Sequence, residues 1–402
     1  MHSIRRSCSS ALRSSIGVCI HVNGTRRAFS RSSACSRGAL PVFLTPSTPE
    51  LGALLGSFNT KVLLPFHLTK EQEKLVYKLD NRAKLDAEPV EITLGDVTLP
   101  LTHINRNKDL PNTWRSLRAI VTQSTTREDW ENVVRVMEGC ENAGRHVKPA
   151  WQEMIVRTLC ANDMHHLVLK ALQRPKATGL RLREYGVLRQ VMKGVHEKAA
   201  LADWEEEDTA KALRLAKQIV ELMDDAEHQA DRQRGEMLQK DDVRGRPTVV
   251  ALPTELAAVL AERYGGDVAE VKKMAGRLMN ALKQHEYMTT INQVESLASK
   301  TSDDFKNGPR QVAALTTHCY ELFDLILVWN ALRTSRKVLG ADMPMAEEAL
   351  KFEQKIEQVL EDGVKAADKL GARNGQRLFS SEDGGLPGRV RDAIQRCRSE
   401  AS

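Results

Sequence analysis

Aromatic and glycine residues recur along the middle of the chain at the spacing of a helical hairpin. Trp114 and Trp151 lie 37 residues apart, and Tyr185 follows Trp151 after 34 residues. Gly144 and Gly179 lie 35 residues apart. Between these positions apolar residues recur at intervals of three and four, which predicts amphipathic helices. Such a recurrence predicts an α-solenoid, in which each helical hairpin needs its neighbours to cover its apolar face.

The rest of the chain also favours helix. Aromatic residues make up only 4% of the sequence, while strong helix formers are plentiful. We therefore predict an all-α fold: an irregular α-solenoid of helical hairpins over 110–239, a linker over 240–252 and a C-terminal helical bundle over 253–371. The broadly apolar segment from His318 to Val338 fits the centre of that bundle or, alternatively, a groove for a partner helix. Residues 372–402 are predicted to be a mobile tail with a short basic helix.

Before the repeats we expect mixed structure. Several prolines and glycines predict an extended arm or linker over 38–68. In the following segment, 69–109, Thr69 and Gln72 match a capping box that begins a helix reaching about Ala83. Apolar alternation on both sides of Gly95-Asp96 predicts one small β-hairpin near 90–101.

The N-terminus has the composition of an import signal. The first 49 residues contain seven arginines, many serines, no lysine and no acidic residue. This pattern predicts a mitochondrial transit peptide over 1–37, with processing near Arg27, Phe29 and Ser30. The alternatives are an ordinary basic arm and a secretory signal, and the second lacks a sufficiently long apolar core. We expect the mature protein in the mitochondrial matrix, or peripherally on the inner membrane.

Without this segment the chain is not basic. Its net charge is +6, of which residues 1–37 contribute +7, so the remainder carries −1. The remaining cysteines, at positions 140, 160, 319 and 397, are scattered and predict reduced thiols. No stretch approaches 18 consecutive apolar residues, so we predict no transmembrane segment.

We find no motif that predicts catalysis. A Ser-centred nucleophile elbow, a zinc-protease motif and a dinucleotide fingerprint are all missing from the sequence. His165-His166 point about 100° apart on a helix and cannot easily share a metal ion. The acidic run from Glu205 to Asp208 fits a helix start better than a divalent-ion site. We therefore predict a protein that is not an enzyme, without catalytic residues, metal or cofactor.

The stretch from Trp130 to Pro149 resembles the second helix and exit turn of pentatricopeptide repeats. The resemblance rests on a helix that ends in Asn142-Ala143-Gly144 and on the following Val147-Lys148-Pro149. It covers about residues 110–225 in about three degenerate units, and it implies binding to RNA. The helices after Pro149 and Arg183 lack the regular polar pairs that read bases, so little sequence selectivity is expected. Helical hairpins of this length also occur in unrelated bundles.

Basic charge coincides with these repeats. Residues 101–200 contain 17 Lys/Arg and 10 Asp/Glu, a balance of +7, whereas residues 201–242 contain 6 and 13, a balance of −7. A positive face on a solenoid is expected of an RNA-binding protein, because neutralised phosphates release counterions. Such charges also occur on ordinary solvated helices, and the acidic block can pair with them. The candidate RNA-binding residues are Arg115, Arg118, Arg135, Arg145, Lys148, Arg157, Arg181, Arg183 and Arg189.

These features predict a non-catalytic adaptor in mitochondrial gene expression, bound to mitochondrial RNA or to a ribonucleoprotein such as the mitochondrial ribosome. The alternative is an assembly chaperone that holds subunits of a respiratory-chain complex. An enzyme without a recognisable local motif is a third alternative.

Overall fold

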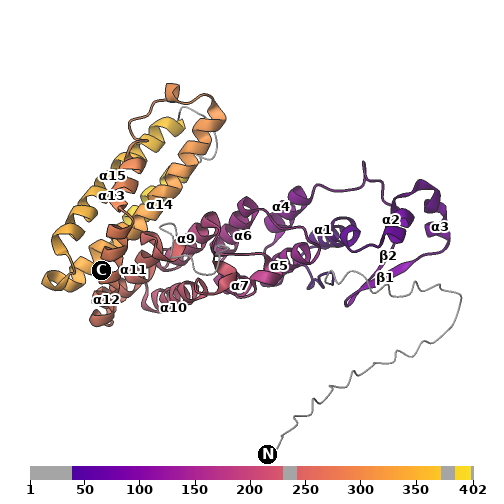
Figure 1. Ribbon diagram of the computed structural model, residues 1–402, viewed down its shortest axis with the longest axis horizontal. Coiled ribbons are helices and arrows are strands. Elements are labelled where there is room, and N and C mark those ends of the chain that lie inside the picture. The colour runs from indigo at the N-terminus through magenta and orange to yellow at the C-terminus, as the bar shows by residue number, and fades with distance from the viewer. Residues whose placement is uncertain (1–38, 230–241, 373–384, 400–402) are drawn as a thin grey trace, which may run out of the picture.

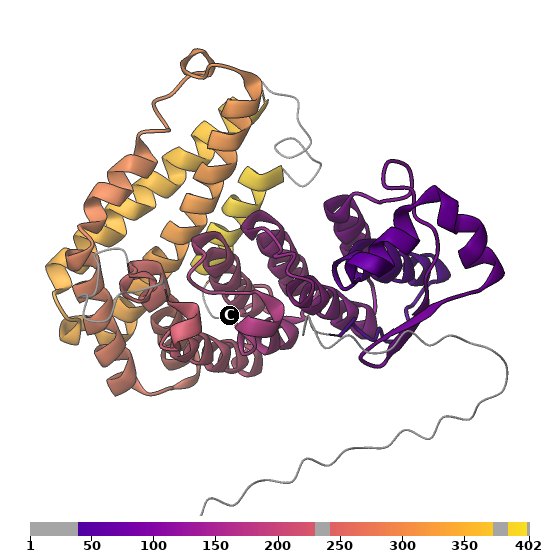
Figure 2. The ribbon, with the colours of Figure 1, turned by 45° about the vertical axis from the view of Figure 1, so that its right-hand side comes forward.

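The computed structural model describes residues 39–229, 242–372 and 385–399, so the predicted processing residues Arg27, Phe29 and Ser30 lie outside the described residues. Within these ranges the protein is helical except for one two-stranded hairpin, which confirms the predicted all-α class. Figure 1 shows helices stacked along an elongated arm that leads into a bundle of longer helices. The bundle rises steeply from one end of the arm, as the second view in Figure 2 also shows.

The segment predicted to be an extended arm is partly helical. Helix α1 (Pro49–Ser57) continues into a π-helical turn over 58–63 and a 3-10 turn over 64–66. The Thr48 hydroxyl accepts a hydrogen bond from the Leu51 backbone, and Pro49 lies at the first helical position, where proline is favourable. Leu51, Leu55 and Phe58 are fully buried. The prolines predicted an extended arm, but Pro49 lies at a helix start, where proline is compatible with helix. The buried apolar stripe of α1 then stabilises the helix.

The preceding residues, 39–47, run along the first repeat. The side chain of Asn132 both donates to the Leu44 carbonyl (3.0 Å) and accepts from the Leu44 backbone N–H (2.7 Å). Ser47 donates its backbone N–H to Asp129 (2.9 Å). This segment and α1 therefore cover the N-terminal end of the helical stack.

The next elements follow the predicted order. The capping box at Thr69 is present and begins α2 (Lys70–Tyr77), which ends earlier than expected and is followed by a 3-10 turn over 79–81 and by α3 (Arg82–Ala87). Strands β1 (Glu91–Leu94) and β2 (Val97–Pro100) pair in antiparallel fashion, with Ile92 opposite Leu99. Gly95 adopts φ +67° at the turn, as a tight hairpin requires.

Three helical hairpins form the repeat region, made of the helices α4 (Thr113–Gln123), α5 (Arg127–Asn142), α6 (Pro149–Ala161), α7 (His165–Leu172), α8 (Pro175–Thr178), α9 (Tyr185–Ala200) and α10 (Glu206–Leu222). The first helices of the hairpins contact one another in the order α4, α6, α9, and the second helices in the order α5, α7, α10. The rings of Trp114 and Trp151 stack with centroids 5.9 Å apart. Gly144 and Gly179 both have positive φ, at +67° and +72°. The recurrence in the sequence thus corresponds to equivalent positions in a stack of hairpins.

The C-terminal bundle begins earlier than expected. Its helices are α11 (Pro247–Tyr264), α12 (Val268–Gln284), α13 (Tyr287–Glu295), α14 (Gly308–Leu339), α15 (Ala346–Ala372) and α16 (Gly385–Arg398), with short 3-10 turns over 226–228, 243–245, 302–304 and 340–342. The predicted linker over 240–252 therefore contains the first turns of α11, and Pro253 lies inside that helix. Proline normally interrupts a helix, but complete burial of Leu252 and Leu256 on either side holds this one together.

The predicted mobile tail contains a docked helix. Helix α16 is basic, as expected, but it packs against α9, α14 and α15. Leu386, Val390, Ile394 and Cys397 are buried at intervals of three and four residues. This apolar stripe accounts for the docking, which the basic composition of the helix had obscured.

Helix α14 forms the centre of the bundle. The segment Gly308–Asp342 is long and apolar enough to cross a membrane by length and composition alone, in contrast to the expectation from uninterrupted apolar runs. However, 56% of its most apolar window is buried within the protein. Because α11, α12, α15 and α16 all contact α14, its apolar breadth fits the central helix of a bundle.

Candidate nucleic-acid interface

The first turns of α4, α6 and α9 meet along one edge of the repeat stack. Trp114 in the first turn of α4 stacks on Trp151 in the first turn of α6. The first turns of α6 and α9 are also close, because Gly186 of α9 packs against the Glu153 side chain of α6 without room for a larger residue. Three helix N-termini, each with a partial positive charge, therefore line the same edge, which we call the N-terminal edge.

Five of the nine candidate cations lie on this edge or in the loops that lead into it: Arg115, Arg145, Lys148, Arg181 and Arg183. Arg115 and Lys148 are exposed, and Lys148 is the N-cap residue of α6. The Arg145 guanidinium lies 5.0 Å from the centroid of the Phe66 ring and donates to the Thr113 hydroxyl (3.3 Å). Arg145 thus joins the N-terminal segment to the first repeat as well as adding charge to the edge.

A surface hollow of about 610 Å³ lies on this edge, between the loop that leads into the second hairpin and the loop that leads into the third. Arg181 and Arg183 line it together with His146, and so do the carboxylates of Glu141, Glu184 and Glu227. Glu141 is 2.7 Å from the His146 imidazole, and Glu184 is 3.8 Å from Arg183. The charge of this part of the edge is therefore mixed.

The four other candidates lie elsewhere. Arg118 and Arg157 are exposed on the bodies of α4 and α6, and Arg157 donates to the hydroxyl of Tyr320 in α14 (2.9 Å). Arg189 is largely buried and pairs with Asp324 of α14 (3.1 Å). Arg135 of α5 donates to the Val42 carbonyl. Arg135 thus binds the N-terminal segment to α5, and Arg189 binds the repeats to α14. The nine candidates therefore do not form one surface.

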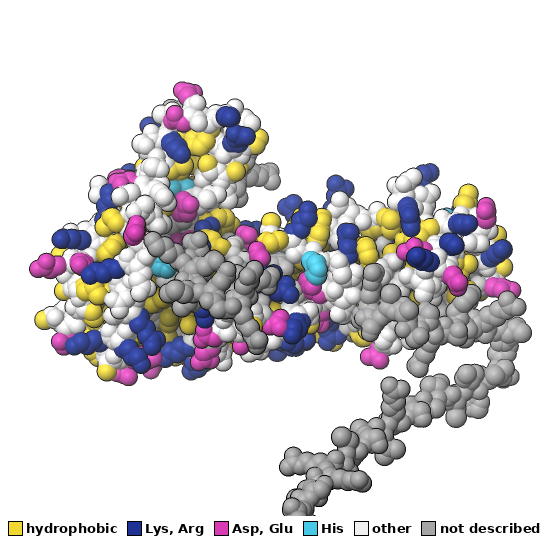
Figure 3. Space-filling model, in the orientation of Figure 1, with side chains coloured by type: hydrophobic (Ala, Val, Ile, Leu, Met, Phe, Trp, Pro, Cys, Tyr) yellow, Lys and Arg dark blue, Asp and Glu magenta, His cyan; other side chains and the backbone are white. Residues whose placement is uncertain are grey.

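The acidic block that follows the repeats pairs with some of their cations. Lys176 lies 2.6 Å from Glu227, and Lys198 lies 3.8 Å from Asp208. Figure 3 shows basic and acidic side chains interspersed over the face in view, without a single continuous basic patch. The sequence's separation into a basic and an acidic block is therefore reduced once the chain is folded.

The adjacent histidines do not form a metal site. The ring of His165 is buried, and its Nε2 lies 2.9 Å from the Gly194 carbonyl. His165 Nδ1 lies 3.2 Å from Asp163, while His166 is exposed. His165 therefore links helices α7 and α9 by a hydrogen bond between its side chain and the backbone of α9.

Two buried polar clusters that the sequence analysis missed lie where the repeats meet the bundle. In the first, the carboxylate of Asp324 accepts from the Tyr185 hydroxyl (2.7 Å) and pairs with Arg189. Burial raises the pKa of Asp324, although the charge of Arg189 opposes this shift. Asp324 is the one charged residue in the apolar run from Leu322 to Leu332, and such an isolated charge is the signal that could have identified it.

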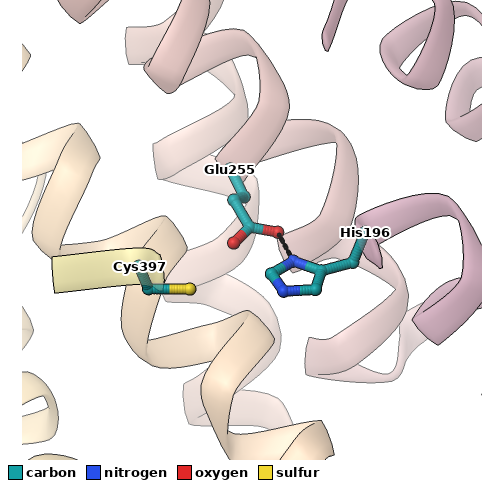
Figure 4. Close-up of side chains that lie close together, drawn as sticks. All are labelled: His196, Glu255 and Cys397. Atoms are coloured by element: carbon teal, nitrogen blue, oxygen red, sulfur yellow. Dashed lines mark hydrogen bonds and ion pairs between the residues drawn. The ribbon is translucent and has the colours of Figure 1, made fainter. Parts of the chain in front are cut away.

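In the second cluster, His196 of α9, Glu255 of α11 and Cys397 of α16 meet in the core (Figure 4). Glu255 lies 2.9 Å from His196 Nδ1 and accepts a hydrogen bond from Asn330 of α14 (2.5 Å). Burial alone would lower the pKa of His196, but Glu255 and Cys397 together, through their charges and hydrogen bonds, outweigh burial and raise that pKa well above its usual value. Glu255 is the only charged residue between Val249 and Leu260, a signal that the sequence analysis overlooked.

A family profile described as mitochondrial ribosomal protein mS27 matches residues 27–383, which is most of the chain. The chain belongs to the mS27 family. It is also 28% identical over 255 residues to the small ribosomal subunit protein mS27 of Neurospora crassa. That alignment covers 62% of this chain and 64% of the relative, so the chain spans less than two thirds of the length of the relative that it matches.

Membership of the mS27 family supports the predicted mitochondrial location and the association with the ribosome. The comparisons give no support to the alternative of a respiratory-chain assembly chaperone. They identify mS27 rather than a pentatricopeptide repeat family, so the resemblance to those repeats stays a prediction.

Proposed function

We propose that this protein is a non-catalytic component of the small subunit of the mitochondrial ribosome, in the matrix, and that it contacts ribosomal RNA through the N-terminal edge of its repeats. The observation that carries the proposal is the match to the mS27 family across residues 27–383. The protein's resemblance in sequence to mS27 of Neurospora crassa, a small-subunit protein by name, agrees with it.

The N-terminal edge supports the RNA contact. Phosphate groups bind favourably at helix N-termini, where backbone N–H groups point outward and the helix dipole favours negative charge. Three such termini lie side by side here, and the exposed side chains of Arg115 and Lys148 flank them. A contact of this kind positions the protein on structured RNA without reading its sequence, which fits the lack of base-reading polar pairs.

Co-sedimentation tests the ribosomal role. The tagged full-length protein, expressed in mitochondria, is expected to migrate with the small ribosomal subunit on a sucrose gradient. Migration only in the light fractions, at low as well as at physiological salt, would contradict it.

A charge-neutralised variant tests the RNA contact separately. The triple variant Arg115→Gln, Lys148→Gln and Arg181→Gln removes three cations from the N-terminal edge. If all three contact phosphates, the slope of log affinity for ribosomal RNA against log salt should decrease by roughly 2–3. The matched control neutralises Lys273, Arg277 and Lys306, which are exposed in the bundle, and should leave the slope unchanged.

An unchanged slope in the first variant would reject the proposed edge. The ribosomal role would stand in that case if the wild-type protein still migrated with the small subunit. The two parts of the proposal therefore fail independently.

A further inference from the structure

The side chains of His196, Glu255 and Cys397 supply the atoms of a mixed metal site. They offer one nitrogen, one oxygen and one sulfur atom, and these three atoms all lie within 4.8 Å of one another. Figure 4 shows the Cys397 sulfur directed toward the imidazole and the carboxylate. The three residues come from three helices and lie up to 201 positions apart in the sequence, so no local sequence motif brings them together.

The spacing of these atoms is close to that of a zinc site. Zn–N and Zn–O bonds of about 2.0 Å and a Zn–S bond of about 2.3 Å place tetrahedral ligands roughly 3.3–3.8 Å apart. Nδ1 of His196 and Oε2 of Glu255 are 2.9 Å apart and would separate slightly as an ion replaced the proton between them. The sulfur would move inward. Shifts of about 1 Å at the side-chain tips complete the geometry.

The charges balance without an uncompensated ion in the core. In the absence of metal, the raised pKa values of His196 and Cys397 favour an imidazolium and a neutral thiol beside the Glu255 carboxylate, and these charges sum to zero. Binding of Zn²⁺ would release two protons, one from the imidazolium and one from the Cys397 thiol. Neutral imidazole, carboxylate, thiolate and Zn²⁺ again sum to zero, so the large penalty for burying net charge is avoided.

The three side chains contact one another inside the core. His196 contacts both the Glu255 carboxylate and the Cys397 thiol, so each potential ligand already faces the other two. The other carboxylate oxygen of Glu255 is held by Asn330, which is the kind of supporting contact that orients metal ligands. His196, Glu255 and Asn330 are each at most 2% exposed, so the site is shielded from solvent.

We propose that His196, Glu255 and Cys397 bind one zinc ion that fastens α16 to the junction of the repeats and the bundle. A nitrogen, an oxygen and a sulfur ligand suit Zn²⁺ better than Mg²⁺ or Ca²⁺, which prefer oxygen ligands alone. A water molecule is the expected fourth ligand. The ion would be structural, because the site lies in the core.

Metal analysis of the purified full-length chain tests this proposal. Cys8, Cys19 and Cys35 are replaced by serine in every sample, so that N-terminal thiols do not add to the count. After growth with zinc and extensive dialysis, we expect about one zinc ion per chain. Cys397→Ser and His196→Asn should each lose it. Cys319→Ala, which removes a buried cysteine outside the cluster, should keep it.

Cobalt substitution of the same protein provides a second readout that needs no further variant. Co²⁺ bound to Cys397 should give a thiolate charge-transfer band and the intense visible bands of tetrahedral cobalt. A folded wild-type chain without zinc and without these bands would overturn the proposal. Retention of zinc by folded Cys397→Ser would also overturn it. If that variant does not fold, the wild-type spectrum decides.

Discussion

The repeats and the bundle use buried polar side chains in different ways. In the repeats such side chains mostly bond to backbone groups of adjacent loops and segments: Asn132 bonds to Leu44 in the segment before α1, and Gln152 donates to the Gly179 carbonyl (3.1 Å). Where the repeats meet the bundle, Glu255 and Asp324 bond to side chains from other helices. The first arrangement fixes loops and the second fixes the relative position of helices, so loss of a polar group should have different consequences in the two regions.

The largest effect is expected at Glu255. Replacing Glu255 with alanine leaves His196 and Asn330 without their shared partner in the core, and should lower the free energy of unfolding by about 3–5 kcal/mol. Urea unfolding, monitored by circular dichroism, measures this loss in the free energy of unfolding. A loss below about 1 kcal/mol would mean that the cluster does not hold the helices together, and the contrast between the two regions would not stand.

In the repeats, the stacked tryptophans should matter most. Trp114→Ala removes the aromatic contact between the first two hairpins and should cost about 2–3 kcal/mol, from lost burial plus lost stacking. Trp114→Phe keeps an aromatic ring and should recover much of this loss. Urea unfolding of both variants measures these losses. If Trp114→Ala and Trp114→Phe are equally stable, the packing of the hairpins does not depend on the aromatic contact.

Stability should also depend on pH through His318 of α14. Burial lowers the pKa of His318 to about 4, while the unfolded value is 6.5, so the unfolded chain binds the proton more readily. Its stabilising contribution is complete above pH 6.5 and is lost as the pH falls toward 4. Between pH 7 and pH 5 the loss is about 2 kcal/mol.

Urea titrations at pH 7 and pH 5 measure this loss in the free energy of unfolding. Between these pH values a His318→Gln variant should lose less stability than the wild type, because glutamine does not bind a proton. In the metal-free protein His196 provides a contrast of opposite sign, because its pKa is raised in the folded state and its contribution is lost as the pH rises. Equal pH slopes in the wild type and in His318→Gln would contradict the assignment.

The smallest effect is expected at a helix cap in the repeats. The Thr126 hydroxyl accepts from the Asp129 backbone N–H (3.3 Å) at the start of α5, and the Asp129 carboxylate accepts from the Thr126 backbone (3.0 Å). In urea unfolding, Thr126→Ala should lower the free energy of unfolding by about 1 kcal/mol, whereas Thr126→Ser should leave it nearly unchanged. A penalty as large as that of Glu255→Ala would remove the distinction between the regions.

The same distinction explains what could be predicted from the sequence. The capping residue Thr69 and the glycine at position 144 act over a few residues, so their patterns predicted where a helix begins and where one ends. Pro253 failed as a boundary because burial of Leu252 and Leu256 against other helices outweighs its local preference. The partners of Glu255 and Asp324 are contributed by other helices, and spacing along the chain carries no information about which helices meet.

Prediction of the candidate interface was limited in the same way. Charge counts identified the basic region, and five of the nine cations lie on one edge because equivalent loops of a repeat lie side by side. The counts do not distinguish Arg115, which is exposed, from Arg189, whose partner Asp324 lies 135 residues further along the chain.

The segment that runs from residue 39 through α1 has a consequence for assembly. A stack of hairpins is open-ended by nature, and its terminal apolar faces invite a further unit. Here one terminus is covered by α1 and by residues 39–47 beside α5, and the opposite terminus by α11. Because both ends of the stack are covered by other parts of the described chain, further hairpins do not add to it. A larger assembly therefore contacts the stack through its sides.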